Sequence, residues 1–404
     1  MKLLLESWRR FVVLHEGISP ETIEKIEKAI ARAGGESYIV GGAVRDELIP
    51  GAPSSKDIDF LIRKLSLDRI KASIQHLGKV KEVGQAFGIV TATIDGEEFD
   101  FAIPRTSETK TGEKHTDFEV TTDPNAPIEA DLGRRDFTIN ALARDPRGQV
   151  IDMFGGQKDI EQKIIRAVGD ANERFAEDPL RMLRAIQFAT RFDFTIEPKT
   201  AEAIKKNLDK LDTLAGERIL LEFEKAWTKG ATNSARFIEL LEGTGIGKHI
   251  FGETFQPKPV VIPGDSRNKV LGNAMAFFMH GGDYAKMKPS ADMAKHIELA
   301  RTSLSGREVY DYGGKDRDKL ELLAEVLQQV GYPEESEKIR TTLDTNLPLH
   351  PKELAVGGAD LVQLGFKGPR IGQIQKRLLQ AVHAGEVKNE NDQLINYLDM
   401  LEKL

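Results

Sequence analysis

The chain has 404 residues, with 57 lysines and arginines, 64 aspartates and glutamates, and no cysteine. This length predicts two to four domains, and the absence of cysteine excludes disulfide scaffolds, thiolate catalysis, Cys-ligated zinc and iron–sulfur clusters. The net charge of −7 means that a nucleic-acid partner would have to be bound by local basic surface. The apolar run at residues 3–5 is too short for a signal peptide and no segment is long enough to span a membrane, so we expect a cytoplasmic protein with no membrane partner.

The first 150 residues alternate between helical and strand patterns, which predicts a mixed α/β region. Helical spacing of apolar residues predicts helices over residues 22–32 and 44–48 and an amphipathic helix over residues 8–14. Asp95-Gly96 separates two strand-like runs and predicts a hairpin. Residues 105–127 lack periodicity and are predicted to form a long functional or mobile loop. The predicted strands cover residues 38–40, 57–62, 88–94 and 98–103.

Helical patterns dominate after residue 153. Prolines in residues 252–265 indicate a linker or an ordered loop, and short helices follow from residue 273. The predicted helices before that segment cover residues 157–164, 179–191, 200–207, 216–229 and 234–241.

A glycine turn followed by two aspartates is the first group of residues that indicates chemistry. Asp57 and Asp59 are two apart on a predicted strand, so their carboxylates share one face. Such oxygen ligands suit Mg²⁺ in a phosphoryl-transfer site, and Asp100 on a second strand could supply a third carboxylate. The Gly41-Gly42 turn could bring backbone N–H groups to a triphosphate, with positive charge from Arg45 a few residues later.

A second group lies in the stretch RRDFTINALA. Arg135 could pair with a phosphate, while Asp136 or Asn140 could bind ribose hydroxyls. A local Arg135–Asp136 salt bridge is the structural alternative.

A third group begins one predicted helix, in EDPLRMLRAIQF. Asp178 before Pro179 is placed to cap the helix, and Arg181 follows on a neighbouring face. A carboxylate accepts hydrogen bonds and a guanidinium donates them, which complements the pairing edges of cytosine and adenine; uracil and guanine reverse that pattern. The structural alternative is that Asp178 is only a helix cap, with Arg181 as its partner.

These motifs together resemble the class II tRNA nucleotidyltransferases and the bacterial poly(A) polymerases. GGAVRD with DID, RRDFTINALA, DMFGGQKD, EDPLRMLRAIQFATRF and GERI with Glu222 occur in that family's order. The resemblance implies an α+β fold in which a polymerase-β-like nucleotidyltransferase head precedes all-helical neck, body and tail domains. The implied divisions are residues 1–156 for the N-terminal helix and the head, 157–230 for the neck, and 231–404 for the body and tail.

The resemblance also implies roles for individual residues. Asp57 and Asp59 would be the Mg²⁺ ligands, with Asp100 as a further catalytic carboxylate, and Asp178 and Arg181 would select the base. The family often has an arginine where this sequence has Gln187, which puts one phosphate contact in question. In relatives, the loop matching residues 105–127 is linked to the switch from adding C to adding A. The implied nucleotide-binding set is Gly41, Gly42, Arg45, Arg135, Asp136, Asn140, Asp178, Arg181 and Arg184, the last near the phosphates.

The C-terminal run from residue 356 to residue 372 also resembles a segment of the bacterial branch. Between Gly365 and Arg377 the chain has four basic residues and no acidic one, and Gly368-Pro369 precedes a predicted helix. These features predict an RNA phosphate contact, with a solvated basic helix start as the alternative. The predicted RNA-binding residues are Lys367, Arg370, Lys376 and Arg377.

The sequence therefore predicts template-independent addition of CMP and AMP to the 3′ end of tRNA, with CTP and ATP as substrates and no obligate protein partner. A poly(A) polymerase, or an enzyme that adds only part of CCA, is the nearest alternative because these enzymes share the catalytic motifs. A catalytically silent RNA-binding protein and a nucleotidyltransferase acting on a protein or small molecule are more distant alternatives.

Overall fold

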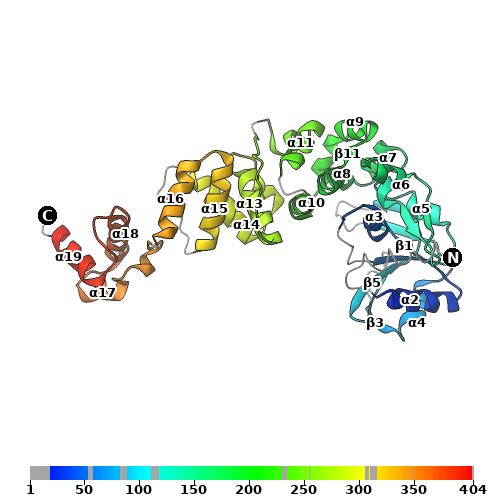
Figure 1. Cartoon of the computed structure of the whole chain (residues 1–404), viewed down its shortest axis with the longest axis horizontal. Helices are drawn as coiled ribbons and strands as arrows, with labels where there is room; N and C mark the ends of the chain where they lie inside the picture. The colour runs from blue at the N-terminus through cyan, green and yellow to red at the C-terminus, as the bar shows by residue number, and fades with distance from the viewer. Residues whose placement is uncertain are drawn as a thin grey trace. The chain divides into compact units, whose positions relative to one another are not determined.

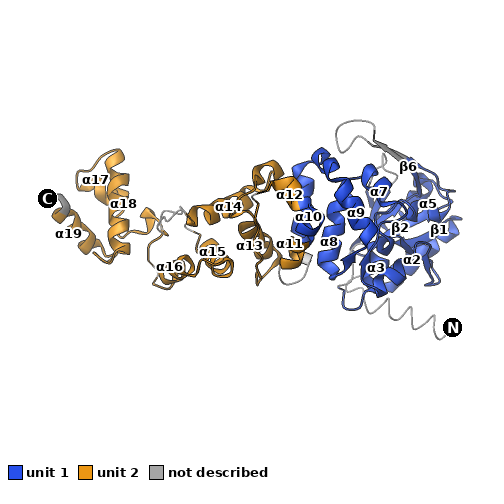
Figure 2. Cartoon of the chain, turned by 90° about the horizontal axis from the view of Figure 1, so that it is seen from above, with its two compact units in different colours: residues 1–226, 240–246 blue, residues 227–239, 247–404 orange. Residues whose placement is uncertain are grey.

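The computed structural model describes residues 19–52, 58–81, 89–110, 118–229, 234–253, 255–304, 309, 316–345 and 347–402. The chain forms two compact units, one of residues 1–226 and 240–246 and the other of residues 227–239 and 247–404 (Figure 2). Within the described ranges, no helix combines the length and apolar character that crossing a membrane would require. The helix predicted over residues 8–14 lies outside these ranges.

A seven-stranded mixed sheet organises the first unit, with strand order β3-β4-β5-β2-β1-β8-β9. Strands β2 and β5 run parallel, and the other neighbouring pairs are antiparallel. Helices α2 and α4 lie on one side of this sheet and α3 lies on the other (Figure 1). The strand bounds are β1 Glu36–Val40, β2 Ile58–Arg63, β3 Gly78–Lys81, β4 Ile89–Ile94, β5 Glu97–Ala102, β8 Leu142–Arg144 and β9 Val150–Asp152.

Alternation along the central strands separates an apolar face from a polar one. Phe60 on β2 and Phe99 and Phe101 on β5 are fully buried on one face, and the rings of Phe60 and Phe101 stack 5.3 Å apart. Asp59 and Asp100 point to the opposite face because successive side chains of a strand alternate. Burial of the three phenylalanines on one face therefore places Asp59 and Asp100 on the opposite face of the sheet.

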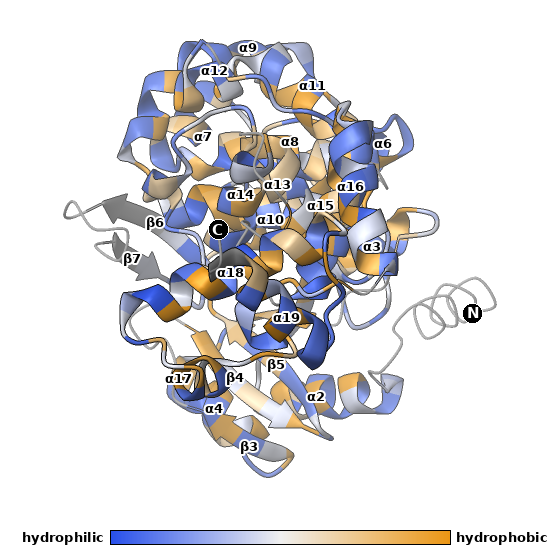
Figure 3. Ribbon diagram, turned by 90° about the vertical axis from the view of Figure 1, so that its left-hand side faces the viewer, coloured by the Kyte–Doolittle hydropathy of each residue, from blue (hydrophilic) through white to orange (hydrophobic). Residues whose placement is uncertain are grey.

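Helix α2 (Pro20–Arg32) illustrates how local sequence sets these elements. The Ser19 hydroxyl accepts a hydrogen bond from the Thr22 N–H and caps the helix, and proline occupies the first turn. Ile23, Ile26 and Ile30 form the buried stripe of this helix. Hydrophobic and hydrophilic residues alternate along the helix (Figure 3). The helix ends before the glycine pair, as the sequence predicts.

The sheet hairpin also forms where the sequence predicts it. Asp95 and Gly96 have φ values of 51° and 91°, which is typical of the two-residue turn that suits the twist of antiparallel strands.

The remaining described elements are mostly helical. The helices of the head and of the segment after it are α3 Gly42–Leu48, α4 Leu67–Ile74, α5 Ile128–Leu132, η2 Thr138–Asn140, α6 Gly156–Glu161, α7 Ala171–Glu177, α8 Leu180–Phe192, α9 Pro198–Lys206, η3 Leu208–Thr213, α10 Gly216–Lys229, α11 Ala235–Thr244 and α12 Ile246–Phe251. The later helices are α13 Ser266–Phe278, η4 Tyr284–Met287, α14 Ala291–Ser303, α15 Arg317–Val330, α16 Pro333–Asp344, η6 Pro351–Glu353, α17 Gly358–Gln363, α18 Pro369–His383 and α19 Asn391–Glu402. Two short strands, β10 Ile164–Ile165 and β11 Thr195–Ile196, pair in parallel.

Over its described residues, the second unit contains two separate hydrophobic cores. One core uses α13 to α16 and the other uses α17 to α19 with the segment before them. The proline-rich segment 252–265 is an ordered loop over its described part, because Val260 and Ile262 are buried in the first core. The Val260 N–H donates to the Ser234 hydroxyl at 2.9 Å, which fixes the backbone of the loop.

The structure corrects two sequence predictions in the first unit. The helix predicted over residues 157–164 ends at Glu161, and residue 164 lies in β10. Residues predicted as an aperiodic loop contain an antiparallel pair, β6 Arg105–Lys110 and β7 Phe118–Thr122, with an irregular register next to Arg105. The strands were not predicted because a polar segment shows no alternation of apolar residues, although its backbone can still pair as a sheet. The elements α4, β3, α5, β8, β9 and α7 were also not predicted from the sequence.

Candidate active site

A cavity of about 480 Å³ in the first unit gathers most of the residues singled out from the sequence. Among the described residues that line it are six arginines and five aspartates, so it is rich in charged groups, with one more basic residue than acidic ones. Asp57 lies outside the described residues. The predicted residues that line the cavity are Gly41, Gly42, Arg45, Asp59, Asp100, Arg135, Asp136, Asn140, Asp178, Arg181 and Arg184.

Two carboxylates stand side by side at the sheet. Asp59 on β2 and Asp100 on β5 are directly opposite each other in the parallel register. Neighbouring strands are about 4.8 Å apart, so their side chains emerge together on the same face. The Thr91 hydroxyl on β4 donates to Asp100 at 2.5 Å and orients that carboxylate. This pair supplies adjacent oxygen donors of the type that hard divalent cations prefer.

The glycine turn before α3 brings two arginines close to the backbone. Gly41 has φ 74° and ψ −125°, a conformation that residues with a side chain rarely adopt. A Cβ on Gly41 would lie 2.5 Å from Nη1 of Arg135, and one on Gly42 would lie 3.5 Å from Nη2 of Arg45. Gly41 is therefore favoured by its backbone conformation and by the Arg135 guanidinium beside it, whereas a Cβ on Gly42 would make only an ordinary contact.

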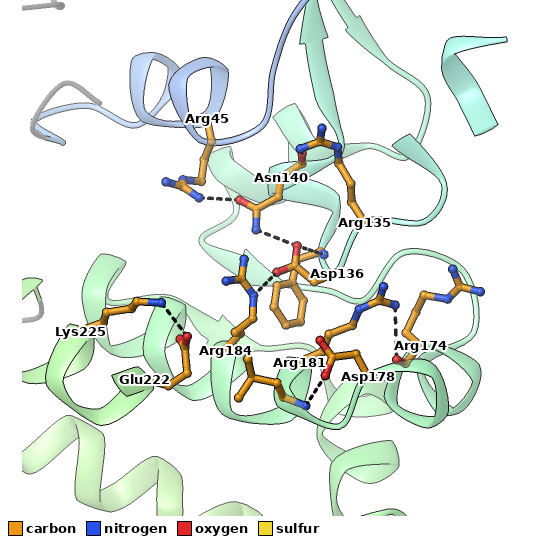
Figure 4. A network of polar contacts seen from close by, with 12 residues as sticks. Arg45, Arg135, Asp136, Asn140, Arg174, Asp178, Arg181, Arg184, Glu222 and Lys225 are labelled. Carbon is orange, nitrogen blue, oxygen red and sulfur yellow. Dashed lines mark hydrogen bonds and ion pairs between the residues drawn. The ribbon is translucent and has the colours of Figure 1, made fainter. Parts of the chain in front are cut away.

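Asp136 is the centre of a buried hydrogen-bond network (Figure 4). Its carboxylate accepts from Arg184 Nε at 2.7 Å, from Asn140 Nδ2 at 2.9 Å and from the Phe137 N–H at 2.8 Å. Burial opposes ionisation, but the charge of Arg184 and these hydrogen bonds hold the pKa of Asp136 below its ordinary value. In return, the Asp136 carboxylate raises the pKa of the Arg184 guanidinium.

The local Arg135–Asp136 salt bridge is not the arrangement found. Arg135 instead pairs with Asp131 at 3.2 Å and donates to the Asn140 carbonyl at 3.4 Å. Asp136 therefore positions Arg184 and Asn140, and Arg135 faces the glycine turn.

At the start of α8, the side chains of Asp178 and Arg181 bind different partners. Asp178 accepts from the Leu180 N–H at 3.1 Å, so it caps the first turn although the helix begins one residue later than predicted. Arg181 donates to the Arg134 carbonyl at 2.9 Å and to Glu177 at 2.9 Å. The alternative in which Arg181 is the partner of Asp178 is therefore wrong, and both side chains line the cavity.

Other residues contribute to this site without having been singled out from the sequence. Arg105, Asp131 and Arg134 line the cavity, and Arg134 could have been suspected because it precedes Arg135 in the same motif. Gln187, at the position where the family often has arginine, is 3% exposed on α8 and is not among the described residues that line the cavity.

The predicted RNA-binding residues lie in the second unit, in and just before α18. Lys367, Arg370, Lys376 and Arg377 are all exposed, and the Arg370 guanidinium lies 5.3 Å from the Phe366 ring centroid. Gly368 at the helix start has φ 58° and supplies no capping side chain. Lys367 and Arg370 lie at the N-terminus of α18, where the helix dipole is also positive, so this end of the helix concentrates positive potential; Lys376 and Arg377 lie further along the helix.

Comparisons with known proteins agree with these motifs. The chain matches the family model for the poly(A) polymerase head domain over residues 37–166, a model for an RNA- and SrmB-binding site of polymerase A over 193–256, and one for tRNA nucleotidyltransferase domain 2 over 289–398. It is 33% identical to the CCA-adding enzyme of Streptococcus sanguinis strain SK36, over 94% of this chain and 96% of that one.

Solved structures give the same result at the level of the fold. The Bacillus stearothermophilus CCA-adding enzyme in complex with CTP has a TM-score of 0.71 and 25% identity, covering 96% of this chain and all of that chain. The Thermotoga maritima CCA-adding enzyme complexed with tRNA has a TM-score of 0.69 and 22% identity, covering 97% and 98% of the two chains. With the motifs, the head fold and the near full-length identity taken together, this chain belongs to the family of CCA-adding enzymes.

Proposed function

We propose that this protein adds CMP and AMP to the 3′ end of tRNA by Mg²⁺-dependent nucleotidyl transfer. One observation carries the proposal: the Asp59–Asp100 carboxylate pair lines the same cavity as Asp178 and Arg181. The first pair suits phosphoryl transfer and the second suits selection of a base. The names of its relatives favour CCA addition over poly(A) synthesis.

The carboxylates form the end of the cavity where the metal would bind. Adjacent carboxylate oxygens on Asp59 and Asp100 fit a hard divalent cation, and Asp57, two residues before Asp59, is proposed as a further ligand. When bound, Mg²⁺ would neutralise phosphate charge and favour ionisation of the RNA 3′-hydroxyl.

The arginines and glycines would hold the triphosphate. In the transfer, the RNA 3′-oxygen bonds to the α-phosphorus and the bond to pyrophosphate breaks, so the phosphates must lie in line with the attacking oxygen. Arg45 and Arg135 flank the Gly41-Gly42 turn, and Asp136 orients Arg184 beside them. Asn140, fixed by Arg45 and Asp136, is proposed to position the ribose.

Asp178 and Arg181 would replace a nucleic-acid template. The Asp178 carboxylate accepts from the exocyclic amine that cytosine and adenine share, and Arg181 donates to the adjacent ring nitrogen. Uracil and guanine would each leave buried donors or acceptors unpaired, at a cost of about 1–3 kcal/mol per group. Because Arg181 is anchored by a backbone carbonyl and by Glu177, its position is set before a nucleotide binds.

The four basic residues in and just before α18 are proposed to bind RNA phosphates. All four side chains are exposed, and the helix N-terminus beside Lys367 and Arg370 adds N–H groups to their charge. This contact would hold the tRNA body while its 3′ end is extended.

The test is incorporation of each labelled nucleotide, singly and in pairs, into tRNA transcripts that end at the discriminator base, at C and at CC. Ordered addition of two C and one A that then stops is the expected result. Long A tails would indicate a poly(A) polymerase, and A added only after CC would indicate an A-adding enzyme.

Variants of the carboxylates test the metal assignment. Asp57→Ala and Asp100→Asn should abolish transfer while leaving tRNA binding intact, whereas Asp68→Asn, an exposed aspartate on α4, should behave like the wild type. Transfer retained by either site variant would overturn the assignment, and tRNA binding without any incorporation by the wild type would indicate a silent RNA-binding protein.

A further inference from the structure

Helix α8 carries an aromatic shelf that supports Arg45. The shelf consists of Phe188 and Phe192, one helical turn apart, whose rings are nearly parallel with centroids 6.0 Å apart. The Arg45 guanidinium, which comes from α3, lies 5.0 Å from the first ring centroid and 4.9 Å from the second. Arg45 therefore lies across both rings, and it is only 4% exposed.

Two polar groups fix the edges of the same guanidinium. Asp46 accepts from Arg45 Nε at 2.7 Å and from its Nη2 at 2.6 Å, and Asn140 accepts from its Nη1 at 2.5 Å. The other Asp46 oxygen accepts from Arg191 at 3.1 Å, and Arg191 lies 4.6 Å from the Phe192 ring centroid. Helix α8 thus contacts Arg45 directly through the shelf and indirectly through Arg191 and Asp46.

Three guanidinium groups, those of Arg45, Arg184 and Arg191, contact the shelf rings. Asp46 pairs with Arg45 and Arg191, and Asp136 pairs with Arg184. Both carboxylates therefore hold in place guanidinium groups that lie on the shelf.

Phe188 and Phe192 differ in burial, although Phe192 also packs against the buried Phe194 ring, with centroids 5.6 Å apart. Phe188 is 5% exposed, whereas Phe192 is only partly buried. Each ring that faces a desolvated guanidinium stabilises its position through the negative face of the π-system. Phe192 and Arg191 therefore contact a ligand-binding group, directly and through Asp46, in addition to their packing.

We propose that Phe192 and Arg191 are positioning residues that hold the Arg45 guanidinium at the triphosphate end of the cavity. The same helix would then select the base with its first turn and set the phosphate contact with its last turn. This inference rests on the proposed function, in which Arg45 binds the triphosphate.

The first experiment measures binding of tripolyphosphate, CTP and ATP by calorimetry without tRNA, together with steady-state kinetics. Phe192→Leu keeps apolar bulk but removes the ring face, and we expect Kd for all three ligands and KM for both nucleotides to rise by about five- to thirty-fold. The value of kcat should stay within about twofold, because the phosphate contact is made in both the ground state and the transition state. Phe192→Tyr, which keeps the ring, should restore binding.

Arg191→Met provides a second test that removes little core volume. It should weaken tripolyphosphate binding by about three- to ten-fold through Asp46, and Arg191→Lys should recover part of the loss. Arg63→Met is the matched control, because Arg63 also forms a partly buried ion pair, with Glu36 at 2.8 Å, and does not line the cavity among the described residues.

A double-mutant cycle with Arg45→Met separates positioning from general packing. If Phe192 acts through Arg45, Phe192→Leu should have no further effect on tripolyphosphate binding in the Arg45→Met background. Equal effects in both backgrounds, or unchanged binding in both Phe192→Leu and Arg191→Met, would overturn the inference. A wild type that binds tripolyphosphate but adds no nucleotide to tRNA would refute the proposed function while leaving this cycle interpretable.

Discussion

Gly41→Ala separates the conformational role of the glycine turn from its role beside the ligand. The conformation at Gly41, φ 74° and ψ −125°, costs a residue with a side chain about 1–3 kcal/mol of folding stability. The new methyl group would also lie 2.5 Å from Nη1 of Arg135, and the flexible guanidinium would have to move away. Stability should therefore fall by about 1–3 kcal/mol, and the phosphate contact proposed for Arg135 should be lost in addition.

Loss of the proposed Arg135 phosphate contact should affect activity more than the loss of stability does. A charge-assisted hydrogen bond to a phosphate contributes about 1.5–3 kcal/mol, which corresponds to a rise of roughly 10- to 150-fold in KM for CTP and ATP. Both nucleotides should be affected equally because they share the triphosphate. The assay is steady-state addition to a tRNA transcript, with urea denaturation measured on the same preparations.

Gly34→Ala is the matched control. Gly34 also has a positive φ, 85°, but a Cβ there would meet nothing within 4 Å. It should lose stability without a change in KM. If Gly41→Ala and Gly34→Ala have the same KM, Arg135 does not bind the triphosphate from its position beside the turn.

Three further predictions concern the base, the pH dependence of stability and the RNA contact. Asp178→Ala should cost about 1 kcal/mol of stability through the lost Leu180 cap, but it should change the preference for CTP and ATP over UTP and GTP by at least tenfold; unfolding with unchanged selectivity would leave only the capping role. Burial, with repulsion from Asp145 and Glu24, raises the pKa of Glu27 to about 7 from 4.5. The native state therefore keeps a proton that the unfolded chain loses, so the unfolding free energy falls as pH rises from about 4.5 to 7, by at most about 3 kcal/mol. Glu27→Gln should consequently stabilise the protein more at pH 8 than at pH 5 in urea titrations, and an equal effect at both pH values would contradict the assignment. Replacing Arg370 and Lys376 by alanine should weaken tRNA binding and lower the slope of log affinity against log salt by about one to two, with KM for CTP unchanged. Lys79→Ala, at an exposed lysine on β3, should leave the slope as it is.

Elements whose signals are local were predicted well. The Ser19 cap, the proline after it and the apolar stripe define α2, and Asp95-Gly96 defines the β4–β5 hairpin, because both depend on residues close together in the chain. Helix α8 begins within one residue of its predicted start for the same reason. Strand pairing in the polar segment 105–127 was missed, because its alternation carries no apolar signal.

The residues of the candidate site came from the sequence, but their partners did not. Residue type and order placed Asp59, Asp100, Asp178 and Arg181 among the candidates without any knowledge of distance. The register that sets Asp59 opposite Asp100 depends on which strands become neighbours, and sequence spacing does not encode strand order.

The tertiary structure also determines which charged groups pair with one another. Asp136 binds Arg184, 48 residues away, in preference to the adjacent Arg135, and Arg45 lies on aromatic rings from α8. Adjacency in the chain does not by itself bring two side chains together, whereas folding brings distant side chains within hydrogen-bond range. The sequence by itself therefore determined the chemical groups of this enzyme and its local elements, and only the tertiary structure decided which groups hold one another in place.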